Sequence, residues 1–202
     1  MTHTLVIIIM TVIVSLLAWQ SPAFLNRLVF DPLMVKKGQI DRFITYGFIH
    51  AHGWHLFFNM FTLFFFGQAI ERLYIAKFGY LGFLGFYVAA IIFSVLPDFI
   101  KSGNGHTRTV LLGASGGVSA VLFAFVLLAP WQLIYFFAVI PVPAIIFAIL
   151  YVAYSIYAYK KGNDNIGHLA HMAGAVFGVV ATIAIEPALL LHFIGELLNP
   201  KF

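Results

Sequence analysis

The sequence predicts an all-α polytopic membrane protein, built as a bundle of six transmembrane helices. Hydrophobic side chains make up 62% of the 202 residues, and charged side chains make up only 9%. A soluble domain usually contains about 25% charged residues, and a soluble globule of this length could not bury so much apolar surface. The same composition excludes intrinsic disorder. The chain contains no cysteine, which excludes a disulfide scaffold, thiolate metal sites and a cysteine nucleophile.

Six apolar runs approach or reach the roughly 17–25 residues that a membrane-spanning helix requires. Charged residues, prolines and glycines separate these runs. We expect the second run to end at Glu71-Arg72 and the third at Pro97-Asp98, because these pairs interrupt the apolar pattern. The expected helices of this single domain, residues 1–202, cover residues 5–19, 54–70, 78–96, 111–129, 144–159 and 166–185.

Three segments lie outside the expected spans. Residues 20–53 form a long loop that contains several charged residues, and loops of this length tend to be structured and functional. The apolar stretch 133–140 is stopped by prolines too soon to span, so we interpret it as an interfacial connection. The tail, residues 188–202, is expected to lie along the membrane surface. Little basic charge precedes the first run, which favours a retained helix over a signal peptide.

Polar side chains inside the runs are the candidates for chemistry. All seven acidic residues are expected outside the runs or at their ends, but several histidines are not. An ionisable group in a membrane helix is costly and is a functional hypothesis by default. The candidates are His55, Asn59, Ser115, Ser119, His168 and His171.

Two of these candidates occur among small residues. Ser115 lies within Gly113-Ala114-Ser115-Gly116-Gly117, and His171 is followed by Gly174 and Gly178 on the same helical face. Small residues let membrane helices approach closely, so the two faces can bring an imidazole beside a hydroxyl, as an activated nucleophile requires. The alternatives are that Ser115 serves packing only and that His171 is a hydrogen-bonded structural residue.

The arrangement predicted is a Ser–His dyad, because no carboxylate is expected within the spans to complete a triad. Attack on a carbonyl creates an oxyanion that needs preorganised donors. His55 and Asn59 lie one helical turn apart, on one face, and would supply such donors together with the backbone N–H of Ser115. The alternative for Asn59 is an interhelical hydrogen bond.

Taken together, these motifs resemble those of the rhomboid family of intramembrane serine proteases. The family's H-x-x-x-N unit reads His55 to Asn59, and its G-x-S-G unit reads Gly113 to Gly116. Its A-H-x-x-G-x-x-x-G unit begins at Ala170-His171. The order of the units and their places in the second, fourth and sixth runs match the family, and the resemblance covers about residues 42–185.

The resemblance implies a six-transmembrane-helix rhomboid-like bundle and a role for each matched residue. Ser115 would be the nucleophile and His171 the general base, with His55, Asn59 and Ser115 at the oxyanion hole. The supporting positions would be Gly113, Gly116, Gly174, Gly178 and His50, with Glu71-Arg72 as a structural pair.

Two positions depart from the family. Its first loop often has Trp-Arg where this chain has Asp41-Arg42, and many members have an aromatic residue where this chain has Ser119. In the family that aromatic residue packs on the catalytic histidine, so the sequence leaves open what packs on His171.

The implied function is a serine endopeptidase that cleaves transmembrane or juxtamembrane segments of membrane proteins without a cofactor. Its partners would be the lipid bilayer and substrates with helix-destabilised transmembrane segments, because a helix must unwind before a peptide carbonyl can be attacked. No nucleic-acid partner is expected, and the protein would be multi-pass in the cell membrane. The family places the amino terminus in the cytoplasm, whereas the distribution of Lys and Arg favours the reverse.

Three other readings stay open. One is a catalytically inactive rhomboid-like protein that binds membrane helices. Another is a metal-dependent membrane protein, although the chain has no His-Glu-x-x-His unit. A channel or transporter is disfavoured because no inverted repeat is evident. The metal-dependent reading would use His50, His52, His55, His168 and His171.

Overall fold

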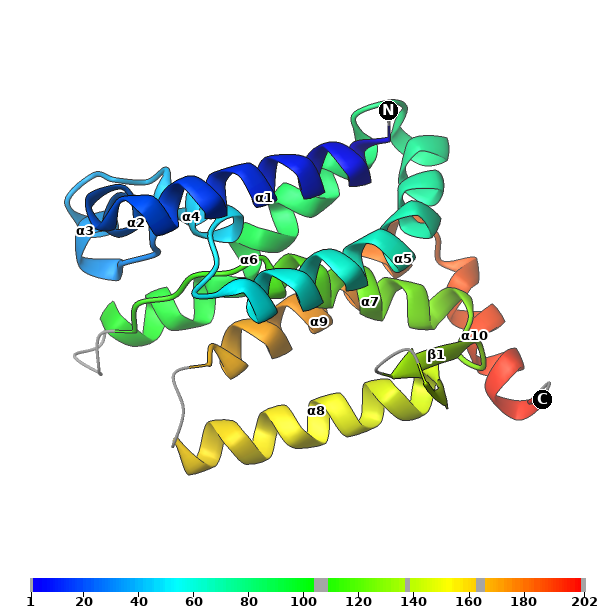
Figure 1. Cartoon of the computed structure of the whole chain (residues 1–202). Coiled ribbons are helices and arrows are strands. Elements are labelled where there is room, and N and C mark those ends of the chain that lie inside the picture. Colours follow the sequence, from blue (N-terminus) through cyan, green and yellow to red (C-terminus); the bar gives the residue numbers. More distant parts are fainter. Residues whose placement is uncertain (1, 104–108, 137–138, 163–165, 201–202) are drawn as a thin grey trace.

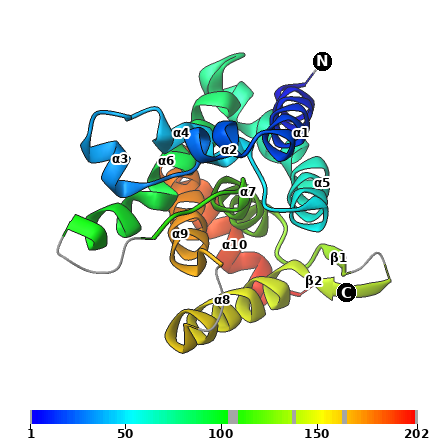
Figure 2. The same ribbon diagram turned by 60° about the vertical axis from the view of Figure 1, so that its left-hand side comes forward.

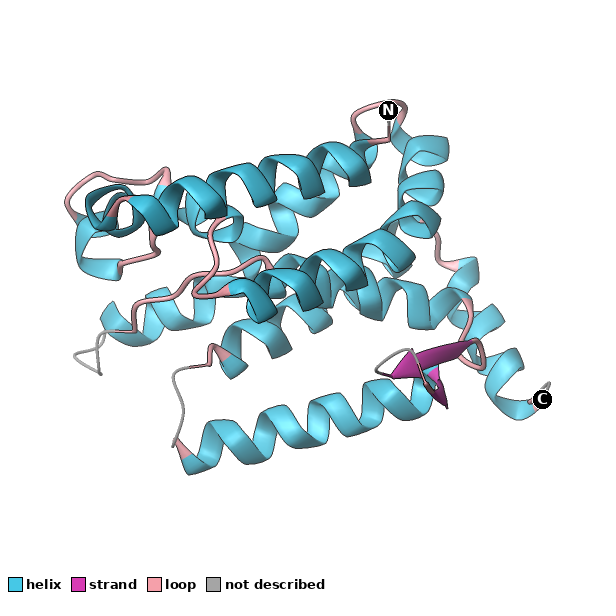
Figure 3. Cartoon of the chain, viewed as in Figure 1, coloured by secondary structure: helices cyan, strands magenta, loops and turns pink. Residues whose placement is uncertain are grey.

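The computed structural model describes residues 2–103, 109–136, 139–162 and 166–200, and their regular secondary structure is helical apart from one small hairpin (Figures 1 and 3). The long helices lie side by side, and short helices cover one end of the bundle (Figure 1). The elements in chain order are α1 (His3–Gln20), α2 (Pro22–Leu28), α3 (Pro32–Lys36), α4 (Arg42–Thr45), the 3-10 helix η1 (Tyr46–Phe48), α5 (Gly53–Phe78), α6 (Gly82–Gly103), α7 (Ser115–Leu128), β1 (Leu133–Phe136), β2 (Ile140–Pro143), α8 (Ala144–Lys161), α9 (His168–Ile185) and α10 (Ala188–Leu198).

Four helices of the described residues are long and apolar enough to cross a membrane, namely α1, α6, α8 and α9. The chain is therefore a helical, multi-pass membrane protein. Helix α5 has 26 residues, but its last turns contain Glu71, Arg72 and Lys77. Helix α7 has 14 residues, or about 21 Å at 1.5 Å per residue, which is less than the roughly 30 Å of a bilayer core. That α5 and α7 also cross the membrane stays a prediction.

Helix α7 is the centre of the bundle. Most of its residues are buried, and Figure 2 shows it enclosed by α5, α6, α9 and α10. Its surroundings are therefore protein side chains along most of its length, which explains how so short a helix stays in the apolar interior.

The expected end of the second helix at Glu71-Arg72 is wrong, because α5 continues to Phe78. The buried Glu71 carboxylate accepts hydrogen bonds from the backbone N–H groups of His3 (2.6 Å) and Thr4 (3.0 Å) and from the Thr4 hydroxyl (2.6 Å). The first N–H groups of a helix have no partner within it and favour negative charge. The amino-terminal end of α1 thus stabilises a buried acidic side chain within α5.

The expected third helix, 78–96, is also wrong at both ends. Helix α6 begins at Gly82 and continues through Pro97-Asp98 to Gly103. A proline removes only one backbone donor, and in membrane helices neighbouring groups compensate for it. Asp98 is buried inside α6, whose candidate span covers residues 82–102, so the expectation that every acidic residue lies outside the spans or at their ends is wrong for Asp98. Glu71 is also buried inside a helix, but that α5 crosses the membrane stays a prediction.

The fourth helix begins at Ser115 rather than at residue 111. Leu111 instead forms an antiparallel bridge with Phe30, with each backbone N–H donating to the other residue's carbonyl. The segment before α7 is therefore extended and fastened to the long loop, which leaves Ser115 at the first position of its helix.

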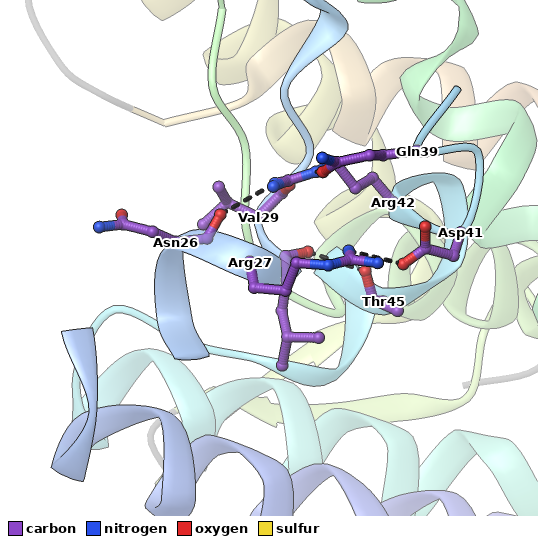
Figure 4. A network of polar contacts seen from close by, with 8 residues as sticks. Asn26, Arg27, Val29, Gln39, Asp41, Arg42 and Thr45 are labelled. Atoms are coloured by element: carbon purple, nitrogen blue, oxygen red, sulfur yellow. Dashed lines mark hydrogen bonds and ion pairs between the residues drawn. The ribbon is translucent and has the colours of Figure 1, made fainter. Parts of the chain in front are cut away.

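The long loop, residues 20–53, is folded, as expected, and Figure 4 shows the polar contacts that fasten it. The buried Arg42 guanidinium donates to the carbonyl oxygens of Asn26 (3.0 Å) and Val29, and to the Gln39 side chain (2.7 Å). Burial lowers the pKa of Arg42. The Thr45 hydroxyl donates to the carbonyl of Leu28 at 2.9 Å.

Asp41, the residue that departs from the family pattern, forms an exposed ion pair with Arg27 at 2.7 Å (Figure 4). The hydrogen bond from Arg27 lowers the pKa of the Asp41 carboxyl. Asp41 and Arg42 thus link the two halves of the loop. Asp41 does so at its surface and Arg42 in its interior.

The connection between α7 and α8 is a two-stranded antiparallel hairpin, β1 with β2, in which Leu133 pairs with Pro143. Residues 137–138 of the interfacial stretch lie outside the described residues, as do residues 201–202 of the tail. The described tail forms α10, which packs on the end of α7. Trp131 donates to the Glu196 carbonyl at 2.7 Å, and His192 contacts the Leu128 carbonyl at 2.9 Å.

Candidate active site

Helices α7 and α9 cross with their backbones in contact. A Cβ atom on Gly174 would lie 2.1 Å from the carbonyl oxygen of Gly116, and one on Gly178 would lie 2.1 Å from that of Ala120. No side chain fits at such distances, so both positions require glycine. The two small-residue faces predicted from the sequence meet here.

The close crossing brings the first turn of α7 beside the first turn of α9. The Ser115 hydroxyl oxygen lies 2.6 Å from Nε2 of His171, which is a short hydrogen bond. Both side chains are half-buried. The contact expected between the fourth and sixth apolar runs is therefore present, in the geometry by which an imidazole accepts a serine proton.

The segment before Ser115 makes room for a third side chain. Gly113 has φ +121°, a conformation that L side chains rarely adopt, and a Cβ there would lie 2.7 Å from Cε1 of His55 and 3.7 Å from the Ser115 hydroxyl oxygen. Glycine at position 113 thus allows the His55 ring to lie against the backbone next to the serine.

Asn59 follows His55 by one turn of α5 and is buried. Its side-chain amide donates to the His55 carbonyl at 2.9 Å. A primary amide has two N–H donors, so this bond orients the side chain and leaves a second donor. His55 and Asn59 come from the same end of α5, which lies beside the first turn of α7 (Figures 1 and 2).

His50 connects the segment before Ser115 to α1. Its Nε2 accepts the backbone N–H of Ala114 at 3.2 Å, and its Nδ1 lies 3.1 Å from the Ser15 hydroxyl. Burial lowers the pKa of His50 to about 3, so the ring is neutral. Because Nε2 is the acceptor, the proton resides on Nδ1 and is donated to Ser15, whose hydroxyl donates in turn to the Phe48 carbonyl.

Tyr46 of η1 and Ser94 of α6 form a second polar group beside the segment that contains Ser115. The Tyr46 carbonyl accepts the N–H of Gly113 at 2.9 Å, and the Tyr46 hydroxyl lies 2.7 Å from the hydroxyl of Ser94. A Cβ on Gly116 would lie 2.2 Å from the Ser94 hydroxyl oxygen. Sequence reasoning missed Tyr46 and Ser94, because nothing in their spacing relates them to Ser115.

The sequence left open what packs on His171, and the structure places Tyr151 of α8 there. The Tyr151 and His171 rings are stacked, with centroids 6.1 Å apart and planes inclined by 25°. The Tyr151 hydroxyl lies 2.7 Å from the hydroxyl of Ser119. Sequence reasoning missed Tyr151, and only the family's missing aromatic residue at position 119 indicated that a substitute was needed.

Five histidines lie in two groups, one of three and one of two. The His50 and His52 rings lie 4.9 and 6.0 Å from that of His55, and the ring of the buried His168 lies 6.0 Å from that of His171. Within the part of the chain that the structure describes, no three His, Asp or Glu side chains are arranged to hold a metal ion. The geometry therefore gives no support to the metal-dependent reading.

Comparisons with known proteins point to the same family as the sequence motifs. Residues 37–187 match the family model described as "Rhomboid domain". The chain is 33% identical over 165 residues to "RHOMBOID-like protein 12, mitochondrial" of Arabidopsis thaliana. The matched region covers 75% of this chain and 48% of that protein. It is 31% identical over 168 residues to "Rhomboid-like protein 16, chloroplastic" of the same plant, covering 74% and 50%.

A shorter match relates the chain to a named protease. "Rhomboid-like protease 1" of Toxoplasma gondii is 40% identical over 65 residues, which is 32% of this chain and 21% of that protein. The chain thus spans about half the length of the two plant relatives and less of the parasite one.

Proposed function

We propose a function from one premise, namely that this chain belongs to the rhomboid family. The protein is an intramembrane serine endopeptidase that cleaves transmembrane or juxtamembrane segments of membrane proteins. The observation that supports this most directly is the 2.6 Å contact between the Ser115 hydroxyl and Nε2 of His171.

In the first step, His171 is the general base. Its Nε2 takes the proton of Ser115 as the hydroxyl oxygen attacks the carbonyl carbon of the scissile peptide. The negative charge that develops on the carbonyl oxygen is stabilised by the Ser115 N–H and by the His55 and Asn59 side chains. Glycine at position 113 keeps His55 beside the serine.

In the second step, His171 acts as a general acid. His171 donates the proton to the leaving amine as the C–N bond breaks, which leaves an acyl ester on Ser115. A water molecule then attacks the ester carbonyl while His171 takes a proton from it. The bond between the carbonyl carbon and the Ser115 oxygen breaks, His171 returns the proton to that oxygen, and the new carboxyl end of the substrate is released. Both side chains are half-buried rather than sealed from outside, which is compatible with the entry of water.

The depth of the dyad bears on where the substrate is cut. Ser115 is the first residue of α7, and His171 is three residues into α9, about 5 Å along its axis. The reaction therefore takes place near one end of the bundle, on the side covered by the folded loop (Figure 1). A substrate segment must be unwound at that depth, so glycine or proline near the cut favours cleavage.

The membrane in which this happens is proposed to be the cell membrane, with the chain crossing it several times. The organelles in the names of the plant relatives belong to those proteins. The proposed orientation places the dyad on the exterior side, and the amino-terminal end of α1 in the cytoplasm.

Co-expression with a panel of single-span membrane proteins tests the function. Wild type is expected to produce a fragment from a substrate with a helix-weakened span, and Ser115→Ala is expected to produce none. A fragment of equal yield from the Ser115→Ala variant would refute the nucleophile. Capture of uncut substrate by wild type, with no fragment, would instead indicate the helix-binding alternative.

A further inference from the structure

Tyr151 of α8 is the aromatic side chain stacked on the imidazole of His171. The two ring centroids are 6.1 Å apart and the planes are inclined by 25°, within the range of offset aromatic stacking. The ring comes from a helix that contributes none of the other proposed site residues. Figure 2 shows α8 at the edge of the bundle, next to α9.

The Tyr151 hydroxyl is anchored on the helix of the nucleophile. It lies 2.7 Å from the hydroxyl of Ser119, which is buried and follows Ser115 by four residues, one turn along α7. One hydroxyl pair therefore connects the helix that presents the nucleophile to the ring that lies on the base.

Two aromatic side chains also lie beside this ring, because its centroid is 5.8 Å from that of Phe123 and 6.2 Å from that of Phe147. A cavity of about 390 Å³ lies beside it, lined by Phe147, Leu150, Tyr154, Ile166, His168 and the dyad's His171. Space on that side would let the Tyr151 ring rotate away from the imidazole. Ring contacts are weakly directional, so the bond to Ser119 is the directional contact that opposes this rotation.

We infer that Tyr151, fixed by Ser119, is a positioning residue that keeps the His171 imidazole aimed at the Ser115 hydroxyl. This rests on the proposed function, in which His171 must take and return a proton at one place. An imidazole that turns about its side-chain bonds loses the 2.6 Å contact with serine. This explains why a small serine can stand at position 119, where many family members have an aromatic residue. Its hydroxyl anchors an aromatic ring that another helix supplies.

Two single variants remove the hydroxyl pair and keep the ring, namely Ser119→Ala and Tyr151→Phe. Each is expected to lower kcat by about three- to tenfold with KM unchanged, the size of effect that one hydrogen bond produces. Because both remove the same bond, the double variant should be no slower than either single one. Tyr151→Leu, which also removes the ring, should be slower than all three.

The matched control is Tyr74→Phe. It removes another hydroxyl pair of a tyrosine, the 3.1 Å contact between Tyr74 and Thr182 of α9, which lies 11 residues beyond His171. This variant should have wild-type kcat. Wild-type kcat in both Tyr151 variants, or losses in Ser119→Ala and Tyr151→Phe that multiply in the double variant, would overturn the inference.

Nitrogen NMR of the His171 ring gives a readout that needs no substrate. Wild type is expected to show one set of narrow ring signals, and Tyr151→Leu shifted or broadened ones, with Tyr74→Phe like wild type. Identical signals in wild type and Tyr151→Leu would overturn the inference. The proposed function fails on a different result, namely cleavage that survives Ser115→Ala.

Discussion

At the scale of single residues, two glycines of α9 decide how near the imidazole comes to the hydroxyl. Gly174 lies one turn after His171 and lies against the backbone of Gly116, the residue that follows the serine. Any side chain at position 174 must therefore push apart the two helices that hold the dyad. The spacing that makes the crossing possible also fixes the distance on which the proposed chemistry depends.

The variant Gly174→Ala tests this crossing. Its Cβ would lie 2.1 Å from a backbone oxygen that cannot move alone, so we expect a loss of about 1–3 kcal/mol in the free energy of unfolding. Cleavage activity should fall as well. The control is Gly195→Ala in α10, where a Cβ meets nothing within 4 Å. Detergent unfolding of the two variants measures the difference, and equal stabilities would contradict the crossing.

The neutral state of His50 gives a pH dependence. Its pKa is lowered to about 3 in the folded protein, against about 6.5 in an unfolded chain. Between these values the unfolded state binds a proton that the folded state does not, so stability falls as the pH drops from about 6.5 toward 3. One such group adds a slope of up to about 1.4 kcal/mol per pH unit.

Unfolding measured between pH 7 and 4 in wild type and in His50→Gln checks this slope. The variant lacks the titrating group, so its stability should fall less steeply with decreasing pH, whatever its stability at pH 7. Parallel curves for the two proteins would show that His50 does not titrate in the way its burial requires.

The residues of the proposed dyad could be predicted from the sequence because each lies among small residues with a characteristic spacing. Gly113, Gly174 and Gly178 are local signals of close approach, and the structure places each at a contact where a side chain would not fit. Tyr151 could not be predicted in this way. Its contact with His171 depends on how α8 packs against α9, and that is not encoded in the spacing of either helix.

At the scale of elements, the ends of helices were the least predictable feature. Glu71-Arg72 and Pro97-Asp98 look like boundaries in the sequence, yet α5 and α6 continue past both. In α5, Glu and Arg are good helix formers, and the Glu71 carboxylate is stabilised by a tertiary contact with the amino-terminal end of α1, 67 residues earlier for Thr4. A local pattern cannot reveal a partner so distant.

Replacement of Glu71 tests whether this carboxylate docks α1. Glu71→Ala leaves the donors of His3 and Thr4 without their acceptor, so we expect a loss of roughly 1–3 kcal/mol in the free energy of unfolding and greater proteolytic sensitivity of α1. Glu71→Gln retains one acceptor oxygen, so its free energy of unfolding should fall by less than that of Glu71→Ala. The neighbouring exposed Arg72 provides the control Arg72→Ala. The docking role is refuted when Glu71→Ala and Arg72→Ala are equally stable.

At the scale of the whole molecule, the composition was enough to predict a helical membrane protein. Four helices of the described residues have the length and apolarity of spans. The short α7 is the exception, and its position at the centre of the bundle explains it, since other helices rather than lipid surround it (Figure 2). That α7 nevertheless crosses from one side to the other stays a prediction from the family resemblance.

Single cysteines test that crossing, because the chain has no cysteine of its own. Leu81 lies in the turn before α6, and Lys161 is the last residue of α8. Three helices, α6, α7 and α8, separate the two positions. We expect a membrane-impermeant thiol reagent to label Leu81→Cys and Lys161→Cys from opposite sides of sealed vesicles. Labelling of both from the same side would contradict the crossing of α7.

The central claim is that His171 activates Ser115, and covalent labelling tests it most directly. A fluorophosphonate probe reacts with activated serines, so mass spectrometry should find its adduct on Ser115 in wild type. The adduct should be absent from His171→Ala and present in Tyr74→Phe. A probe adduct on another residue, or undiminished labelling of Ser115 in His171→Ala, would contradict the account.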